Sequence, residues 1–255
     1  DLIFANDGGN RVWLGRPGGL FRPAEETIGD QPATDVALAD LTGDGALDAV
    51  FANDTAGANE LWKGLGDGGF RGPVTIPGRV DSTAVVTTDV NRDEDPDLVF
   101  ANSGVHARVY GIANRVWIGT GDGGFTESDY TLGTSKSTDL DSGDIDNDGD
   151  RDVVVITDNK LRIWDNQGGG AFNRSQTLNQ DLEGGVRLVD VDGDRDLDVI
   201  AANTIWDNDG NGKFTNRDKT LSTQDAASLA AVDADADGDT DLIVAGDQSG
   251  ARVQL

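Results

Sequence analysis

Five acidic nonapeptides with one common spacing are the residues of this chain best suited to chemistry. Each carries oxygen-bearing side chains at positions 1, 3, 5 and 9, and position 7 can add a backbone carbonyl. Alternate residues of a tightly curled loop point inward together, so one loop can surround a cation with oxygen atoms. Ca²⁺ accepts about six to eight oxygens in flexible geometry, whereas Mg²⁺ demands a smaller octahedron and retains its waters. The motifs therefore predict calcium sites.

We expect about five bound Ca²⁺ ions, one in each loop. The predicted ligands of the five loops, in the order of the motif positions, are Asp40, Thr42, Asp44, Ala46 and Asp48; Asp89, Asn91, Asp93, Asp95 and Asp97; Asp144, Asp146, Asp148, Asp150 and Asp152; Asp190, Asp192, Asp194, Asp196 and Asp198; and Asp233, Asp235, Asp237, Asp239 and Asp241. The alternative is a set of solvated acidic turns that bind nothing, and five copies in register argue against it.

The five loops are not equivalent. The third and fifth have the fullest acidic sets with Gly at position 6, while Thr42 replaces an acid in the first and is expected to lower its affinity. Glu94 and Arg195 stand at position 6, where Gly most easily adopts a positive φ angle, so some backbone strain is expected there. An EF-hand loop would need a bidentate Glu at position 12 and a following helix, and these motifs have neither.

The loops belong to a tandem repeat that spans the chain. The motifs start 49, 55, 46 and 43 residues apart, and residues 1–6 match the end of the motif and the strand after it. We therefore expect the chain to begin inside a repeat. One domain over 1–255 is predicted, with incomplete first and last repeats, and its approximate repeats are 1–39, 40–88, 89–143, 144–189, 190–232 and 233–255.

Short runs rich in Val, Ile, Leu and aromatic residues, separated by Gly, Asn and Asp, predict strands, and no segment has sustained helical spacing. Four strands in each repeat of this length are typical of a β-propeller blade. Counting five first, six second, six third and five fourth strands gives 22. The prediction is an all-β propeller of four-stranded antiparallel blades with six visible repeats; the alternative is a seven-bladed propeller with a portion missing.

Together the acidic loops, the strand Leu-Val-Phe-Ala-Asn at 98–102, the segment Asn-Arg-Val-Trp-Ile-Gly at 114–119 and the turn Gly-Asp-Gly-Gly-Phe resemble FG-GAP/VCBS repeats. Such repeats form the calcium-binding propeller of integrin α subunits, and similar blades occur in some fungal lectins. The resemblance implies that each Ca²⁺ lies in the hairpin between the first and second strands of a blade. Integrin-like propellers usually have seven blades, which keeps the blade number open.

Three further features have two interpretations each. The five Trp fall at one repeat position, so they either fill the space between blades, which we favour, or form sugar-stacking platforms. The insertion 103–114, which holds His106, Arg108 and Tyr110, is a candidate ligand-contacting loop or an ordinary exposed loop. Asp141 and Arg187 share one register of neighbouring first strands, where we expect an ion pair lining a channel, with a channel-bound ligand as the alternative.

Composition excludes several classes of function. The net charge of −27 repels phosphate backbones, so no nucleic acid partner is expected, and no apolar run is long enough for membrane insertion. The chain has no Cys and a single His, and we expect no enzyme. Our main hypothesis is a secreted, extracellular or cell-surface binding and adhesion module with a protein or carbohydrate ligand. The alternatives are a lectin that binds sugars between blades, an accessory propeller of a secreted enzyme, and salt adaptation as the source of the acidity.

Overall fold

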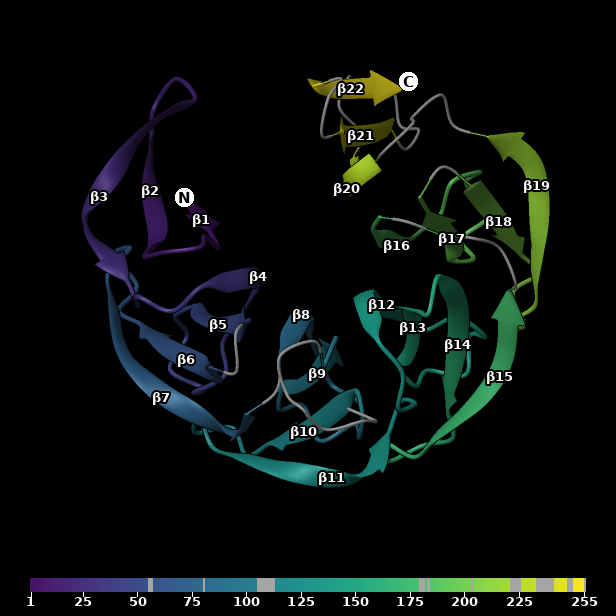
Figure 1. Cartoon of the computed structure of the whole chain (residues 1–255), viewed down its shortest axis with the longest axis horizontal. Coiled ribbons are helices and arrows are strands. Elements are labelled where there is room, and N and C mark those ends of the chain that lie inside the picture. The colour runs from purple at the N-terminus through teal and green to yellow at the C-terminus, as the bar shows by residue number, and fades with distance from the viewer. Residues whose placement is uncertain are drawn as a thin grey trace. The chain divides into compact units, whose positions relative to one another are not determined.

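The computed structural model is all-β (Figure 1) and describes residues 1–54, 57–79, 81–104, 113–178, 182, 184–202, 204–220, 226–232, 241–246 and 250–254. Within these residues there are 22 strands and no helix, which is the number of strands predicted from the sequence. The strands form six antiparallel sheets in which consecutive strands are neighbours, and four of the sheets have four strands. The prediction of four-stranded propeller blades is confirmed.

The chain divides into two compact units, Asp1–Ser137 and Thr138–Leu255. The proposed repeat bounds, the single domain and the blade number stay predictions. The first unit holds the sheets β1–β3, β4–β7 and β8–β11. Its strands are β1 (Leu2–Phe4), β2 (Asn10–Arg16), β3 (Leu20–Ile28), β4 (Ala33–Ala39), β5 (Asp48–Asn53), β6 (Ala58–Gly64), β7 (Phe70–Arg79), β8 (Ser82–Thr88), β9 (Asp97–Asn102), β10 (Arg115–Gly119) and β11 (Phe125–Thr131).

The second unit holds the sheets β12–β15, β16–β19 and β20–β22, and β12 begins at the boundary between the units. The strands are β12 (Ser137–Gly143), β13 (Asp152–Thr157), β14 (Lys160–Asn166), β15 (Phe172–Leu178), β16 (Val186–Val189), β17 (Asp198–Ala201), β18 (Thr204–Asn208), β19 (Phe214–Thr220), β20 (Ala226–Val232), β21 (Asp241–Gly246) and β22 (Gly250–Gln254).

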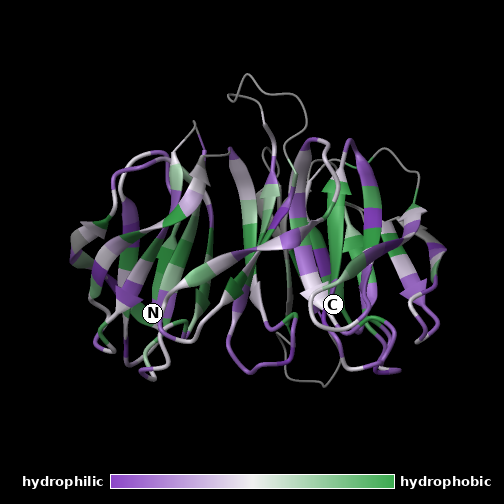
Figure 2. Ribbon diagram, turned by 90° about the horizontal axis from the view of Figure 1, so that it is seen from below, coloured by the Kyte–Doolittle hydropathy of each residue, from purple (hydrophilic) through white to green (hydrophobic). Residues whose placement is uncertain are grey.

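The second strand of each complete sheet forms the centre of the core. Every residue of β5, β9, β13 and β17 is buried, because both faces of these apolar strands are covered. Figure 2 shows hydrophobic residues along several strands and hydrophilic residues in many of the loops that join them. These rigid central strands begin at the last Asp of each acidic motif, so the core holds one end of every described loop in place.

Apolar clusters join successive sheets within a unit, and Trp side chains take part in them. Trp117 of β10 packs with Leu61, Ile76 and other residues of the preceding sheet, and Trp206 of β18 packs with Ile156 and its neighbours in the same way. Trp62 packs against the cluster between the first two sheets. Packing between blades, as predicted for Trp, is confirmed for these three side chains. Trp117 and Trp206 are buried, which removes them as open sugar-stacking platforms, whereas Trp62 is only partly buried.

Candidate metal centres

The acidic loops connect the first and second strands of their sheets, as the repeat pattern predicted. Residues 40–47, 89–96, 144–151 and 190–197 lie between β4 and β5, β8 and β9, β12 and β13, and β16 and β17. In the fifth motif, Asp233, Asp235, Asp237 and Asp239 lie outside the described residues, and Asp241 is buried at the start of β21. Side-chain geometry is therefore defined for the first four loops.

The Asp at position 9 binds two backbone N–H groups in all four loops. In the first loop, Asp48 Oδ2 accepts a hydrogen bond from the Leu41 N–H (2.9 Å) and Oδ1 accepts one from the Gly64 N–H (2.8 Å). The same two bonds recur at each of the other position-9 carboxylates, Asp97, Asp152 and Asp198. This buried carboxylate thus joins the loop to the third strand of its sheet, a role that its prediction as a ligand did not include.

The Asp at position 1 curls the loop. Its Oδ2 accepts a hydrogen bond from the N–H of position 6 at 2.8–3.0 Å in each of the four loops. The residues at position 6 have positive φ angles, and Glu94 (70°) and Arg195 (78°) adopt the conformation expected of Gly. Position 4 is also left-handed, at Arg92 (64°) and Asn147 (60°), which the sequence reasoning missed.

The third loop gathers the best candidate set of metal ligands. Oxygen atoms of Asp144, Asp146 and Asp152 lie within 4.8 Å of one another. Two oxygens at Ca²⁺ bonding distance from one ion can be at most about 5 Å apart, so this set fits a single Ca²⁺. Asp144 Oδ1 is buried and has no hydrogen-bond partner, although Oδ2 of the same carboxylate accepts the Gly149 N–H. A buried carboxylate oxygen without a donor is the kind of atom that a cation satisfies.

Electrostatics in the third loop indicate uncompensated negative charge. Burial raises the pKa of Asp152 to about 7, and its two backbone donors offset only part of that effect. Burial also raises the pKa of Asp146, with Asp148 as the largest repelling charge. The neighbouring third-strand residue Asp165 adds to the repulsion at both carboxylates. A divalent cation would remove this repulsion, so the donor set fits Ca²⁺ in charge as well as in distance.

The fourth loop contains two overlapping groups. Asp190, Asp192 and Asp194 have oxygen atoms within 4.8 Å of one another, and so do Asp192, Asp198 and Asp207. The second group contacts the guanidinium of Arg217 from β19, whose Nη2 lies 2.8 Å from Asp192 Oδ2. Burial raises the pKa of Asp198. This loop thus has carboxylates for a metal and a positive side chain of the protein beside them.

In the first two loops, no three carboxylates of the described residues have oxygen atoms within 4.8 Å of one another. Thr42 replaces the position-3 acid of the first loop, and its Oγ1 is buried without a hydrogen-bond partner. In the second loop the Asn91 Nδ2 donates to Asp93 Oδ2 (2.8 Å), and burial raises the pKa of Asp97 to about 6. The predicted ligands of these loops stay predictions, and their side chains are less closely gathered than those of the third loop.

Two acids outside the acidic motifs lie beside the loops of the second unit. Asp165 and Asp207 follow the Trp of the third strand, where the first unit has Leu14, Lys63 and Ile118. These two acids could have been found from the sequence by aligning the repeats on their Trp residues, because the dipeptide Asp-Asn follows Trp in two of five copies. Arg217 has no such signal, since the corresponding residues of the other repeats are Ala24, Pro73, Ser128 and Ser175.

The expected pair of Asp141 and Arg187 is wrong in its partner. Arg187 Nη1 lies 3.2 Å from Asp139 Oδ2, whereas Asp141 Oδ2 accepts a hydrogen bond from the Leu188 N–H (2.8 Å). The pairing changes because both carboxylates point from β12 toward β16, whose backbone N–H groups compete for them.

In the insertion 103–114, residues 105–112 with His106, Arg108 and Tyr110 lie outside the described residues.

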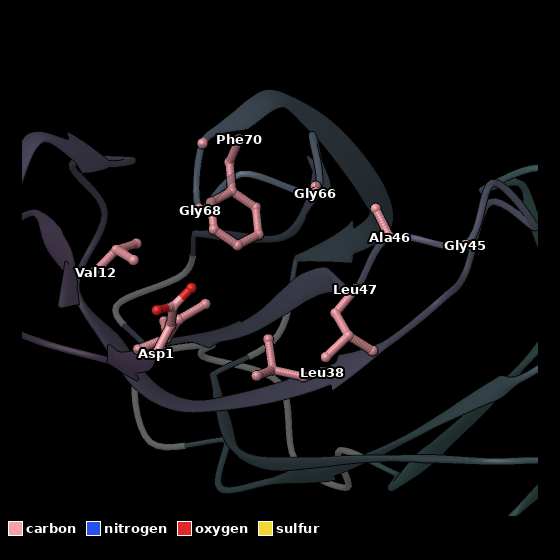
Figure 3. Close-up of a pocket in the computed structure, with 12 residues that line it drawn as sticks. Asp1, Val12, Leu38, Gly45, Ala46, Leu47, Gly66, Gly68 and Phe70 are labelled. Carbon is pink, nitrogen blue, oxygen red and sulfur yellow. The ribbon is translucent and has the colours of Figure 1, made fainter. Parts of the chain in front are cut away.

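A cavity of about 350 Å³ lies between the first two sheets, beside residues 45–47 of the first loop (Figure 3). Ile3, Val12 and Phe70 form its apolar wall, and Asp1 is its only charged lining residue. In the next sheet, the side chains at the repeat positions of Ile3, Val12 and Phe70 belong to or pack against an apolar cluster. That cluster also includes Leu41, the position-2 residue of the first loop. The cavity therefore marks a packing position of the repeat and offers few polar groups for a ligand.

The family comparison agrees with this geometry. The model described as FG-GAP-like repeat matches five overlapping segments, residues 1–51, 40–100, 89–155, 144–201 and 190–244. No curated protein sequence matches the chain significantly. Among the described residues, no helix is long and apolar enough to cross a membrane.

Solved structures are similar in fold at low sequence identity. A protein from Lactobacillus plantarum is 15% identical with a TM-score of 0.59, over 97% of this chain and 77% of that one. A chain of the Photorhabdus luminescens Tc holotoxin pore is 19% identical with a TM-score of 0.50, over 98% of this chain but only 13% of its own length. An Agrocybe aegerita lectin that recognises non-reducing terminal N-acetylglucosamine is 17% identical with a TM-score of 0.48, over 95% and 83%.

Proposed function

This chain belongs to the FG-GAP-like repeat family, and on that premise we propose that it is a calcium-stabilised binding module. The observation that carries the calcium assignment is the third loop, where Asp144 Oδ1 is buried without a donor beside the oxygens of Asp146 and Asp152. The chain's repeats place this kind of loop at the same point of every complete blade, which suits a structural ion better than a single catalytic centre.

Calcium would act mainly on stability. The ion supplies positive charge to carboxylates that repel one another without it, and an ion that binds only the folded chain stabilises it by mass action. Asp144, Asp146, Asp148 and Asp152 would hold the ion in the third loop, with the Asp150 carbonyl. The loops fix the starts of the buried strands β5, β9, β13 and β17, so the ion's effect would reach the core through position 9.

The module would act outside the cell by binding a protein or carbohydrate ligand, without catalysis. Extracellular calcium sites work with dissociation constants of about 10⁻⁴–10⁻³ M, and loops as exposed as these suit that range. Connecting loops on a rigid scaffold commonly carry recognition. A glycan array and a cell-surface protein screen, both with saturating Ca²⁺, would identify the class of ligand.

Thermal unfolding tests the calcium assignment. With Ca²⁺ about 100-fold above its dissociation constant, we expect the Tm to rise by about 5–10 °C over the value in EDTA. The same concentration of Mg²⁺ should give a smaller rise. Asp144→Asn combined with Asp146→Asn should reduce the calcium effect, with Asp7→Asn, between β1 and β2 and outside the acidic motifs, as the matched control. An unchanged Tm together with no bound Ca²⁺ by elemental analysis would overturn the proposal.

A further inference from the structure

The carboxylates beside the fourth loop already contact a cation of the protein itself. Arg217 Nη2 lies 2.8 Å from Asp192 Oδ2 and 4.0 Å from Asp198 Oδ2, and its Nε contacts Asp207 Oδ1. One guanidinium thus faces three carboxylates from the loop and from β17 and β18. The side chains of Arg217 and Asp198 are 23% and 1% exposed. Those of Asp192 and Asp207 are 44% and 37% exposed, so solvent screens their pairs with Arg217 more strongly than the buried carboxylate.

The backbone of the fifth sheet explains how Arg217 reaches the loop. The pairing of β18 with β19 shifts register between Thr204, opposite Thr220, and Trp206, opposite Asn216. Arg217 lies in the resulting β-bulge, and a bulge turns side chains away from their regular direction in the sheet. The corresponding position of the other repeats holds a residue without charge, so only this blade places a cation there.

Arg217 removes one acid from the predicted ligand set of the loop. Asp192 belongs both to the group with Asp190 and Asp194 and to the group around Arg217. The guanidinium, with its Nη2 2.8 Å from Asp192 Oδ2, repels a divalent cation that the same carboxylate would bind. In the third loop the corresponding Asp146 accepts the Asp148 N–H, and its largest charged neighbour is another acid. The two loops therefore have the same motif, but the position-3 carboxylate faces an arginine in the fourth loop and another acid in the third.

We propose that Arg217 is an internal cation that competes with Ca²⁺ for the fourth loop. This inference rests on the proposed calcium function and extends it by assigning different roles to two loops of one sequence type. The third loop depends on a bound ion, whereas the fourth loop is held by Arg217 when calcium is low. Binding of Ca²⁺ at the fourth loop requires the guanidinium to release Asp192, which weakens the observed affinity of that site.

Calcium binding by Arg217→Gln tests the competition. Equilibrium dialysis should show one site that binds Ca²⁺ about tenfold more tightly than in the wild type, or one added site, because a charge-assisted pair no longer opposes the ion. In EDTA the same variant should unfold at a lower temperature, since three carboxylates lose their cation. Arg217→Lys should have a calcium affinity and an unfolding temperature between those of the wild type and Arg217→Gln, because lysine keeps the charge but not the planar fork of donors. Arg174→Gln, an exposed arginine of β15, is the matched control and should change neither value.

The outcomes separate this inference from the proposed function. If the wild type binds Ca²⁺ but Arg217→Gln leaves its affinity and site number unchanged or lower, competition by Arg217 is wrong while the calcium module stands. A gain of one site in Arg217→Gln over a wild type that binds none would support the competition and overturn the calcium module. If Arg217→Gln does not fold, Arg217→Lys decides by the same titration, and no calcium binding in any of the proteins would overturn both.

Discussion

Carboxylates of one acidic motif have different partners, and these partners separate structural acids from candidate ligands. Asp48, at position 9, is fully buried and accepts two backbone N–H groups from different parts of its sheet. Asp44, at position 5, is exposed and accepts one N–H from Ala46 within the loop. An amide at position 44 keeps an oxygen for its single donor. An amide at position 48 cannot accept both of its donors with the one oxygen it has.

We therefore expect Asp48→Asn to lower the free energy of unfolding by about 1–3 kcal/mol in EDTA, where no metal contributes. Asp44→Asn should stay within about 0.5 kcal/mol of the wild type under the same conditions. Denaturant unfolding of the two variants in EDTA checks both values. Equal stability of the two would show that the position-9 carboxylate has no role apart from metal binding.

Backbone strain at position 6 gives a second prediction for a single residue. Glu94 is exposed, has a φ angle of 70°, and donates its N–H to Asp89, so its side chain is not needed for the loop's shape. Glu94→Gly should raise the Tm, by an amount equivalent to up to about 1 kcal/mol, because Gly adopts this φ without a steric penalty. Glu94→Ala removes the same charge but keeps the Cβ. An equal rise in the Ala variant would assign the effect to charge and contradict the strain.

Among the elements, the first strand of each sheet is an edge strand, and carboxylates of the preceding sheet satisfy some of its N–H groups. Asp35 of β4 accepts the Val85 N–H of β8 (2.9 Å). Asp139 and Asp141 of β12 accept the N–H groups of Val186 and Leu188 in β16 (both 2.8 Å). These bonds cover donors that an edge strand otherwise exposes for pairing with another chain. They also join successive blades within each unit.

Asp141 gives this contact a pH dependence. Burial raises the pKa of Asp141, an effect that the Leu188 and Ser142 N–H groups and the Arg187 charge only partly offset. A raised folded-state pKa means that the folded chain holds the proton more tightly than the unfolded chain. Stability from this group is therefore greatest below the unfolded pKa, near 4, and is lost as pH rises through the folded pKa.

The stability of the wild type relative to Asp141→Asn should fall as pH rises above about 4, because Asn cannot ionise. Melting of both proteins in EDTA at a series of pH values gives the difference in Tm. The pH effects of the loop carboxylates, which both proteins contain, cancel in this difference. A difference that is flat or that grows with pH would contradict the burial of a charged carboxylate at this edge.

The sequence was sufficient for the elements and insufficient for their contacts. Spacing of the acidic motifs and of Trp and Phe predicted the number of strands and the hairpin that holds each loop, because the same order of apolar runs, acidic motif and turn recurs along the chain. The spacing could not predict that Arg187 pairs with Asp139, two residues before Asp141. That pairing depends on how far the first strands of adjacent sheets are shifted along each other. Arg217 was missed because a register shift between the third and fourth strands, which recurs in the other sheets, is not visible in the sequence pattern. In this blade the shifted segment holds an arginine that reaches Asp192.

On the scale of the whole molecule, the net charge of −27 is distributed over loops of unequal character. The first unit contains the loop with Thr42 and the loop in which Asn91 donates to Asp93, and neither brings three carboxylates together among the described residues. In the part of the chain that the structure describes, the two loops whose carboxylates do come together belong to the second unit. Calcium should therefore stabilise the second unit more than the first, even though the two units share one fold.

Hydrogen exchange resolves the two units in the intact chain. The buried strands β5 (Asp48–Asn53) and β13 (Asp152–Thr157) directly follow the first and third loops, so each reports the stability that its own loop gains. With Ca²⁺ about 100-fold above its dissociation constant, exchange in β13 should slow by up to about 100-fold relative to EDTA, because protection follows the free energy of binding. Exchange in β5 should slow by less than about tenfold, since the first loop has fewer acids and a weaker site. Mass spectrometry of peptides from both strands measures the two ratios in one sample, which removes differences in concentration and buffer.

Equal slowing of β5 and β13 would contradict the ranking of the loops, because a ligand can stabilise a unit only through a difference in its affinity for the folded and open states.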